Sequence, residues 1–218
     1  MPGGYRKVGD LPALLPVFPL DGALLLPGCQ LPLQIFEPRY LNMIDDAMSG
    51  ERLIGMIQTH GGSRAFPTLV DVGCAGRITA YAETGDGRYM ITLTGICRFA
   101  VREELSTPTP YRQVRPDFDR FASDLEEDDG EVALDRPAFM TALRHYLDHK
   151  GLSVDWDSAR QAPVGALINS LAMGLPLDPP EKQALLEAVT LTDRGQVLEA
   201  LLEIDAAADD DDDPPPLQ

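Results

Sequence analysis

The sequence predicts an α+β protein in which a β-rich first half is followed by a helical second half. In the first half, short apolar runs of alternating polarity are separated by turns that contain glycine and proline. In the second half, apolar side chains recur every three or four positions, which is the spacing of amphipathic helices. The charge changes at the same border, because residues 1–116 contain 11 Lys+Arg and 11 Asp+Glu, whereas residues 117–218 contain 7 and 24.

The first strands are predicted before residue 60. The stretch LLPVFPL (14–20) predicts a short strand at a sheet edge or at a strand start, because proline cannot donate a ladder hydrogen bond. A turn at Pro27-Gly28 precedes an alternating strand, and residues 52–59 (RLIGMIQT) predict a buried strand.

The strongest strand signal lies in residues 67–105. The segment Gly85-Asp86-Gly87 separates two alternating runs and predicts a hairpin turn, because glycine adopts positive φ at little cost. Gly95 interrupts the second run, which predicts a bulge or a corner. A last strand is expected at PYRQVRP (110–116), and many short strands of this kind favour a barrel or a sandwich.

The stretch LQIFEPRYLNMI (33–44) marks a change from strand to helix. Apolar residues alternate in its first four positions and then recur at helical spacing as far as Met48. Pro38 suits the first turn of a helix, where its missing N–H has no partner to lose. We therefore interpret Glu37 and Arg39 as a structural joint between strand and helix. The helix N-terminus favours the negative charge of Glu37, so a catalytic role is not required to explain it.

Four further helices are predicted after residue 134. Each begins at a capping residue or a proline and carries an apolar stripe on one side, which is typical of helix packing. The predicted starts are Asp135, Pro163, the segment Asp178-Pro179-Pro180-Glu181 and Thr192.

The chain is accordingly expected to have four parts. These are a barrel over residues 1–116, an acidic linker over 117–134, a helical bundle over 135–204 and a disordered acidic tail over 205–218. The excess of acid disfavours binding to nucleic acid or to anionic lipid through charge attraction.

Several stretches resemble one known family. The first is VFPLDGALLLPGCQLPLQIFEPRYLNMIDDA, the second is DVGCAGRITAYAETGDGRYMITLTGICRF, and the third is LINSLAMGLPLDPPEKQALLEAVTLTDRGQVL. Together they resemble the N-terminal, substrate-binding domain of Lon proteases over residues 10–204. The resemblance implies a PUA-like β-barrel followed by a helical bundle, and a part in recognising and holding substrate polypeptides.

The sequence departs from a complete Lon protease. It contains no G-x-x-x-x-G-K-[ST] phosphate loop, and none of its three lysines lies in a context that resembles the Ser-Lys pair of the protease. It resembles the bacterial proteins that consist of this domain alone. We therefore expect a non-catalytic polypeptide-binding or adaptor module without a cofactor. Its expected partners are unfolded or extended polypeptides, together with a cellular protease or chaperone.

Candidate binding residues are taken from the joint and its neighbours: Phe36, Glu37, Arg39 and Tyr40. A structural role for them is the preferred interpretation, and Arg39→Ala is expected to lower thermal stability. A groove between barrel and helices is a second candidate site. The alternative functions are small-molecule binding in a barrel pocket and RNA binding through arginines of the β-rich half. Most of these arginines are expected in surface salt bridges: Arg88, Arg98, Arg102, Arg112 and Arg115.

The remaining reactive side chains give weak signals. His145 and His149 are four positions apart on a predicted helix, but no third metal ligand is evident, so surface histidines are expected. The three cysteines, Cys29, Cys74 and Cys97, lie far apart among apolar or small residues and are expected to be buried, reduced thiols. No apolar run is long enough for a membrane span, and a cytoplasmic location is expected.

Overall fold

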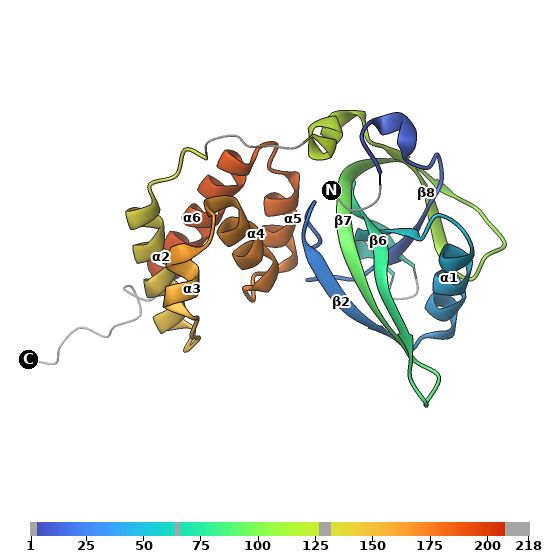
Figure 1. Cartoon of the computed structure of the whole chain (residues 1–218), viewed down its shortest axis with the longest axis horizontal. Coiled ribbons are helices and arrows are strands. Elements are labelled where there is room, and N and C mark those ends of the chain that lie inside the picture. Colours follow the sequence, from blue (N-terminus) through green and yellow to red (C-terminus); the bar gives the residue numbers. More distant parts are fainter. Residues whose placement is uncertain (1–3, 64–65, 127–131, 208–218) are drawn as a thin grey trace, which may run out of the picture. The chain divides into compact units, whose positions relative to one another are not determined.

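The computed structural model describes residues 4–63, 66–126 and 132–207, and it divides into two compact units (Figure 1). The barrel unit comprises Met1–Asp129 and Pro176–Leu186, and the helical unit comprises Gly130–Leu175 and Glu187–Gln218. The helical region that was expected as one bundle over 135–204 is therefore shared, because its segment 176–186 groups with the strands.

The barrel unit is built on one six-stranded sheet with the order β2-β7-β6-β3-β1-β8. The long strand β7 also pairs with β8, so five of the strands close into a ring and β2 is left at an edge. The strands are β1 (Leu15–Pro19), β2 (Gln30–Ile35), β3 (Leu53–Ile57), β6 (Val72–Glu83), β7 (Tyr89–Leu105) and β8 (Arg112–Asp117). A second, two-stranded sheet contains β4 (Thr59–Gly62) and β5 (Pro67–Leu69). The predicted α+β fold class is confirmed.

Strand β1 is not at a sheet edge, because it pairs with both β3 and β8. The backbone N–H of Leu20 donates to Ile57 of β3, so alternation directs the nitrogen of Pro16 to the β3 side and that of Pro19 to the β8 side. Pairing with β3 begins only at Val17, and pairing with β8 ends there. The missing N–H of each proline therefore faces a side on which that part of β1 is not paired. An inner strand can accommodate both prolines in this way.

Both glycine signals of the β6–β7 hairpin are confirmed. The strands are joined by a turn around Gly87, which has φ of +78°. The register shifts by one residue where Gly76 pairs with Gly95, as expected for a bulge. A Cβ atom at Gly95 would lie 2.1 Å from the backbone oxygen of Leu26, so this position accepts only glycine.

Among the described residues up to 126, the barrel unit contains three helical segments. Helix α1 (Pro38–Ser49) begins at Pro38 as predicted and buries one face, which includes Met43 and Ile44. The other two are short 3-10 helices, η1 (Val8–Asp10) and η2 (Asp119–Leu125). The second of these falls within the segment 117–134 that was expected to be a linker.

Helix α5 (Pro179–Glu187) is held to the strands of the barrel unit by polar contacts as well as by buried leucines. Gln58 Nε2, at the end of β3, donates to the carbonyl of Pro179 at 3.0 Å and to Gln183 Oε1 at 3.1 Å. Lys182 Nζ donates to the carbonyl of Gly22 at 2.8 Å, and burial lowers the pKa of this lysine. These hydrogen bonds satisfy buried polar groups and fix the helix to the barrel.

The helical unit contains α2 (Arg136–His149), α3 (Trp156–Gln161), α4 (Val164–Gly174) and α6 (Leu191–Ala207). Asp135 caps α2 as predicted, because its carboxylate accepts from the backbone N–H of Ala138. Helix α6 packs against both α2 and α4. The fully buried side chains of the unit include Phe139, Leu143, Ile168, Leu198 and Leu202. In the described parts of the chain, no helix is long and apolar enough to cross a membrane.

Candidate functional site

The predicted joint lies between the end of β2 and the start of α1. Glu37 is the N-cap residue of the helix and has extended backbone angles (φ −74°, ψ 132°). Its carboxylate makes no capping hydrogen bond; instead, its Oε2 accepts from Arg39 Nε at 2.9 Å and lies 2.8 Å from Arg39 Nη2. Both side chains are about half exposed, so this ion pair has an accessible side.

Tyr40 differs from its neighbours in the joint because its ring belongs to the core. Its ring centroid lies 4.3 Å from that of Phe18, and burial raises the pKa of its hydroxyl. The guanidinium of Arg39 lies 4.5 Å from the centroid of Tyr40 and covers the ring. The joint thus consists of an exposed charged pair above a buried aromatic ring.

Phe36 points away from this core and exposes 61 % of its surface. It follows directly on β2, in which Gln34 pairs with Met90 of β7, and Met90 is 44 % exposed. Alternation along the two strands places Phe36, Gln34, Met90 and Arg88 on the same outer face, and Arg88 lies 6.0 Å from the Phe36 centroid. We call this surface, formed by these four residues, the Phe36 face.

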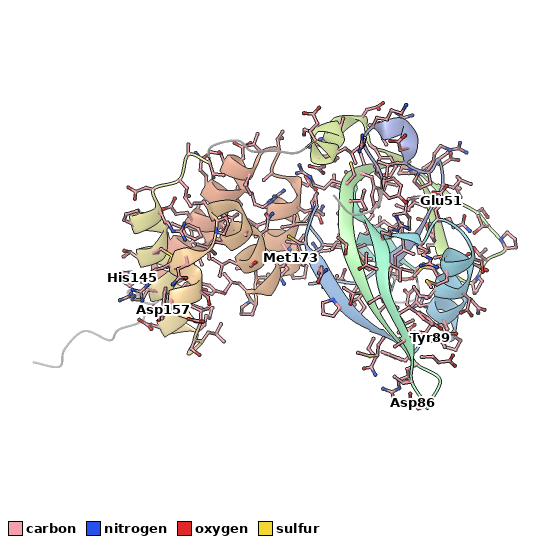
Figure 2. The ribbon with its side chains drawn as sticks, viewed as in Figure 1. Glu51, Asp86, Tyr89, His145, Asp157 and Met173 are labelled. Carbon is pink, nitrogen blue, oxygen red and sulfur yellow. The ribbon has the colours of Figure 1, made fainter. Side chains whose placement is uncertain are left out.

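The Phe36 face lies at the end of the sheet that carries the β6–β7 turn, where Asp86 and Tyr89 are labelled in Figure 2. The turn is charge-balanced, because Arg88 Nε lies 3.0 Å from Asp86 Oδ2. Tyr89 donates to Asp45 of α1 at 3.0 Å, and this hydrogen bond ties β7 to the helix. Met90 therefore lies on a hairpin that is fixed to α1, and not on a loose loop.

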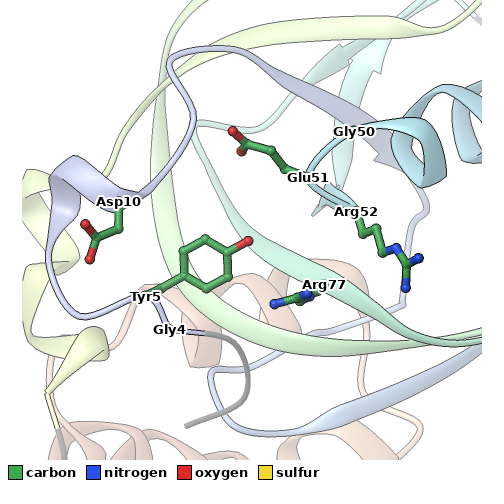
Figure 3. A pocket seen from close by; sticks show the side chains of 7 residues that line it. All are labelled: Gly4, Tyr5, Asp10, Gly50, Glu51, Arg52 and Arg77. Atoms are coloured by element: carbon green, nitrogen blue, oxygen red, sulfur yellow. The ribbon is translucent and has the colours of Figure 1, made fainter.

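A pocket of about 500 Å³ lies elsewhere on the barrel unit, between the N-terminal segment and the end of α1. Figure 3 shows the Tyr5 ring pointing into it, with Glu51 and Arg77 on either side of the hydroxyl end. Burial raises the pKa of Tyr5, while nearby Arg77 acts in the opposite direction. The lining consists of Gly4, Tyr5, Asp10, Gly50, Glu51, Arg52 and Arg77.

One residue of this pocket has a strained backbone. Arg52 has φ of +61°, a left-handed conformation that costs a non-glycine residue about 1 kcal/mol or more. Its N–H donates to Ala47 of α1, and its carbonyl accepts from Ile78 of β6, so two hydrogen bonds hold the conformation. The pocket mixes both signs of charge, which suits a small polar group better than an apolar side chain.

The surface arginines of the sheet are mostly paired, as predicted. The pairs are Arg88–Asp86, Arg102–Asp117, Arg112–Glu104 and Arg115–Glu103. Because each guanidinium already contacts a carboxylate, these side chains do not form a continuous basic surface for RNA.

Arg98 is the exception among the five arginines, because its side chain is buried. It is 3 % exposed and forms a bidentate pair with Asp124 of η2, in which Nη2 donates to Oδ1 at 2.7 Å and Nε donates to Oδ2 at 2.9 Å. Its Nη1 also donates to the carbonyl of Leu186 in α5 at 3.0 Å. These contacts show that η2 and α5 cover the Arg98 side chain.

The three thiols differ in burial, and one histidine contacts a carboxylate. Cys74 and Cys97 are buried as expected, and burial raises the pKa of Cys97 to about 12, far from the thiolate range. Cys29 is only partly buried. His149 Nδ1 lies 2.8 Å from Asp205 of α6, and across the described residues no group of three His, Cys, Asp or Glu could hold a metal.

Comparison with known proteins agrees with this architecture. Residues 14–203 match the family model of the ATP-dependent protease La (LON) substrate-binding domain. A crystal structure of a Lon N-terminal domain protein from Xanthomonas campestris superposes with a TM-score of 0.60 at 23 % identity, covering 87 % of this chain and 97 % of that one. The N-terminal domain of a Mycobacterium avium complex Lon protease gives a TM-score of 0.56 at 18 % identity and covers 87 % and 98 %.

Curated relatives are much longer than this chain. It is 27 % identical to Lon protease 2 of Myxococcus xanthus over 92 % of its own length and 25 % of the relative. It is 28 % identical to a Lon protease of Anaeromyxobacter dehalogenans over 88 % and 23 %. The chain thus spans about a quarter of the length of these relatives. It belongs to the ATP-dependent protease La (LON) substrate-binding domain family.

Proposed function

We propose that the barrel unit binds extended polypeptide segments at the Phe36 face and carries out no chemical step on them. The observation that carries the proposal is the placement of two exposed apolar side chains on one outer face, with Phe36 directly after β2 and Met90 on the neighbouring strand β7. An aromatic ring and a flexible thioether together form an adaptable surface for varied apolar side chains.

The polar surroundings of the Phe36 face fit the same ligand. Arg88 and the Glu37–Arg39 pair flank the apolar groups, and their exposed atoms can donate to and accept from a peptide backbone. Strand β2 is the edge of the six-stranded sheet and offers backbone groups for strand addition, although Pro32 removes one donor.

Membership in the substrate-binding family supports this class of ligand. We infer that the chain holds polypeptides as an adaptor, and that a cellular protease or chaperone acts on what it holds. The ionisable groups at the joint form an ion pair with each other and lie at the surface, so they are placed for contact and not for general acid–base catalysis.

Binding of fluorescein-labelled casein, followed by fluorescence anisotropy, tests the proposal. Phe36→Ala and Met90→Ala are each expected to weaken binding by about three- to tenfold, because each removes one exposed apolar contact. Phe66→Ala is the matched control, since Phe66 is 80 % exposed in the same unit but lies next to β5. Equal binding by all four proteins would remove the Phe36 face from the proposal.

A further inference from the structure

A second pocket, in the helical unit, has a lining unlike the rest of that unit. It has a volume of about 240 Å³ and lies between α2 and α3. The lining residues are Arg136, Pro137, Met140, Arg144, Trp156 and Arg160. The sequence ranges of the helical unit contain five Lys and Arg residues, and three of these line the pocket. No carboxylate is among the lining residues. We call it the Arg–Trp pocket.

The three arginines differ in how far their guanidinium groups are already held by contacts within the protein. Arg136 Nη2 donates to the carbonyls of Ala159, Arg160 and Ala162 at 2.8 Å each, so it fixes the end of α3. Arg160 Nη2 lies 3.6 Å from a carboxylate oxygen of Asp157, a long and exposed contact. The guanidinium of Arg144 lies 5.0 Å from the Trp156 ring centroid, and no carboxylate of the described residues lies within ion-pair distance of it.

The combination of arginines with a tryptophan favours a ligand that has both carboxylates and flat apolar groups. Planar guanidinium groups bind carboxylates with two parallel hydrogen bonds, and a tryptophan face accepts a proline ring or another flat apolar group. A segment that carries several carboxylates next to prolines satisfies both features. The most acidic segment of this kind in the sequence has the five aspartates 209–213 followed by the three prolines 214–216.

We propose that this acidic segment of the chain binds in the Arg–Trp pocket of the same molecule, independently of the polypeptide binding proposed above. Charge complementarity is the first argument, because the segment carries five successive negative charges and the pocket lining carries three positive ones.

Chain connectivity is the second argument. Asp205 of α6 lies 2.8 Å from His149 and 2.6 Å from Lys150, so the end of α6 is held at the end of α2. Arg144 precedes His149 on α2 by about 7.5 Å at the helical rise. Helix α6 continues to Ala207, and residues 209–213 follow that residue by two to six positions, which span at most about 7–21 Å when extended. The tether raises the local concentration of the segment to the millimolar range, where even weak sites fill.

Trp156 makes the proposal measurable, because it is the only tryptophan of the chain. In the full-length protein, quenching of its fluorescence by acrylamide reports how well the pocket is covered. Changing all five aspartates 209–213 to asparagine is expected to raise the quenching constant about twofold. A synthetic peptide of residues 208–218, added to this variant, should restore protection in a saturable and salt-sensitive manner.

The arginines of the pocket are tested on the same asparagine background. Arg144→Gln with Arg160→Gln should weaken binding of the peptide by about tenfold, as expected for two exposed charge contacts. Arg102→Gln is the control, since Arg102 is equally exposed but lies in the barrel unit. Circular dichroism checks that each variant keeps its helices.

Two results would overturn the proposal. One is an unchanged quenching constant after the aspartates are replaced, combined with no response to the peptide. The other is protection of Trp156 that increases with protein concentration, because the segment would then come from a second copy of the chain.

Discussion

At the scale of single residues, exposure decides which charged groups matter for stability. The Glu37–Arg39 pair is half exposed, whereas the Arg98–Asp124 pair is almost completely buried. Solvent screens the first pair and not the second. Although the two N–O distances are similar, removing one partner should therefore lower the free energy of unfolding much more for the buried pair.

Arg39→Ala is expected to lower the free energy of unfolding by about 0.5–1 kcal/mol, because it removes both the ion pair and the cover of Tyr40. Thermal unfolding measures the change. Arg115→Ala is the matched control, since Arg115 has an equally exposed partner, Glu103, at 3.4 Å, and is expected to change stability by less than about 0.5 kcal/mol. An unchanged melting temperature for Arg39→Ala, together with weaker casein binding, would assign the joint to function.

Asp124→Ala is expected to be far more damaging, at about 3–5 kcal/mol in urea unfolding, because it leaves a buried guanidinium without its carboxylate. The double variant Arg98→Met with Asp124→Leu should recover a large part of this loss, since it removes both charges. A loss below about 1 kcal/mol for Asp124→Ala would mean that solvent reaches this pair.

At the scale of elements, helix caps and glycines determine where helices begin and where strands bend or turn. The carboxylate of Asp155 caps α3, and its hydrogen bond from Ser158 lowers its pKa below the ordinary value. Because the pKa is lower in the folded state, this stabilisation is complete above the pKa of the unfolded chain and is lost as the pH falls through the folded value.

Asp155→Ala should therefore reduce stability at neutral pH, and the difference from the unchanged protein should shrink as the pH falls below about 4. Urea unfolding, followed by the emission of Trp156 at the start of α3, measures both curves. A difference that stays constant from neutral to acidic pH would mean that the cap does not depend on the charge of Asp155.

Gly95→Ala is expected to destabilise the barrel unit by more than about 3 kcal/mol, because its Cβ would meet the backbone of Leu26 and neither strand can move freely. Gly85→Ala is the control, since a Cβ there meets nothing within 4 Å. Similar unfolding midpoints for the two variants would contradict the close approach of β7 to residues 26–27.

Local signals also explain how much of the fold could be predicted from the sequence. Helix α1 and the β6–β7 hairpin follow from Pro38 and from the glycines of the turn, because these residues restrict the backbone wherever they occur. Helix α3 has only six residues and no apolar stripe, so periodicity could not detect it. The inner position of β1 and the burial of Arg98 depend on partners more than 20 residues away, which no local pattern contains.

The candidate site was predictable to a similar extent. The joint was located correctly in the sequence, but the separation of exposed Phe36 from buried Tyr40 is a property of the packed unit. Met90 and Arg88 join Phe36 only through the pairing of β2 with β7, and the sequence alone gives no register between those strands.

At the scale of the whole molecule, the family is established and the place of polypeptide binding is the central claim. We propose that the barrel unit holds extended segments at the Phe36 face. The Arg–Trp pocket of the helical unit adds a separate site for an acidic segment. The two sites differ in chemistry, so casein binding and Trp156 quenching should respond to different substitutions.

Hydrogen–deuterium exchange with saturating casein tests the central claim most directly. The account predicts slower exchange at the end of β2 and in the first residues of β7, around Phe36 and Met90, with no change in β4–β5 and no cleavage of the casein. Protection confined to other strands, or casein fragments produced by the pure protein, would contradict it.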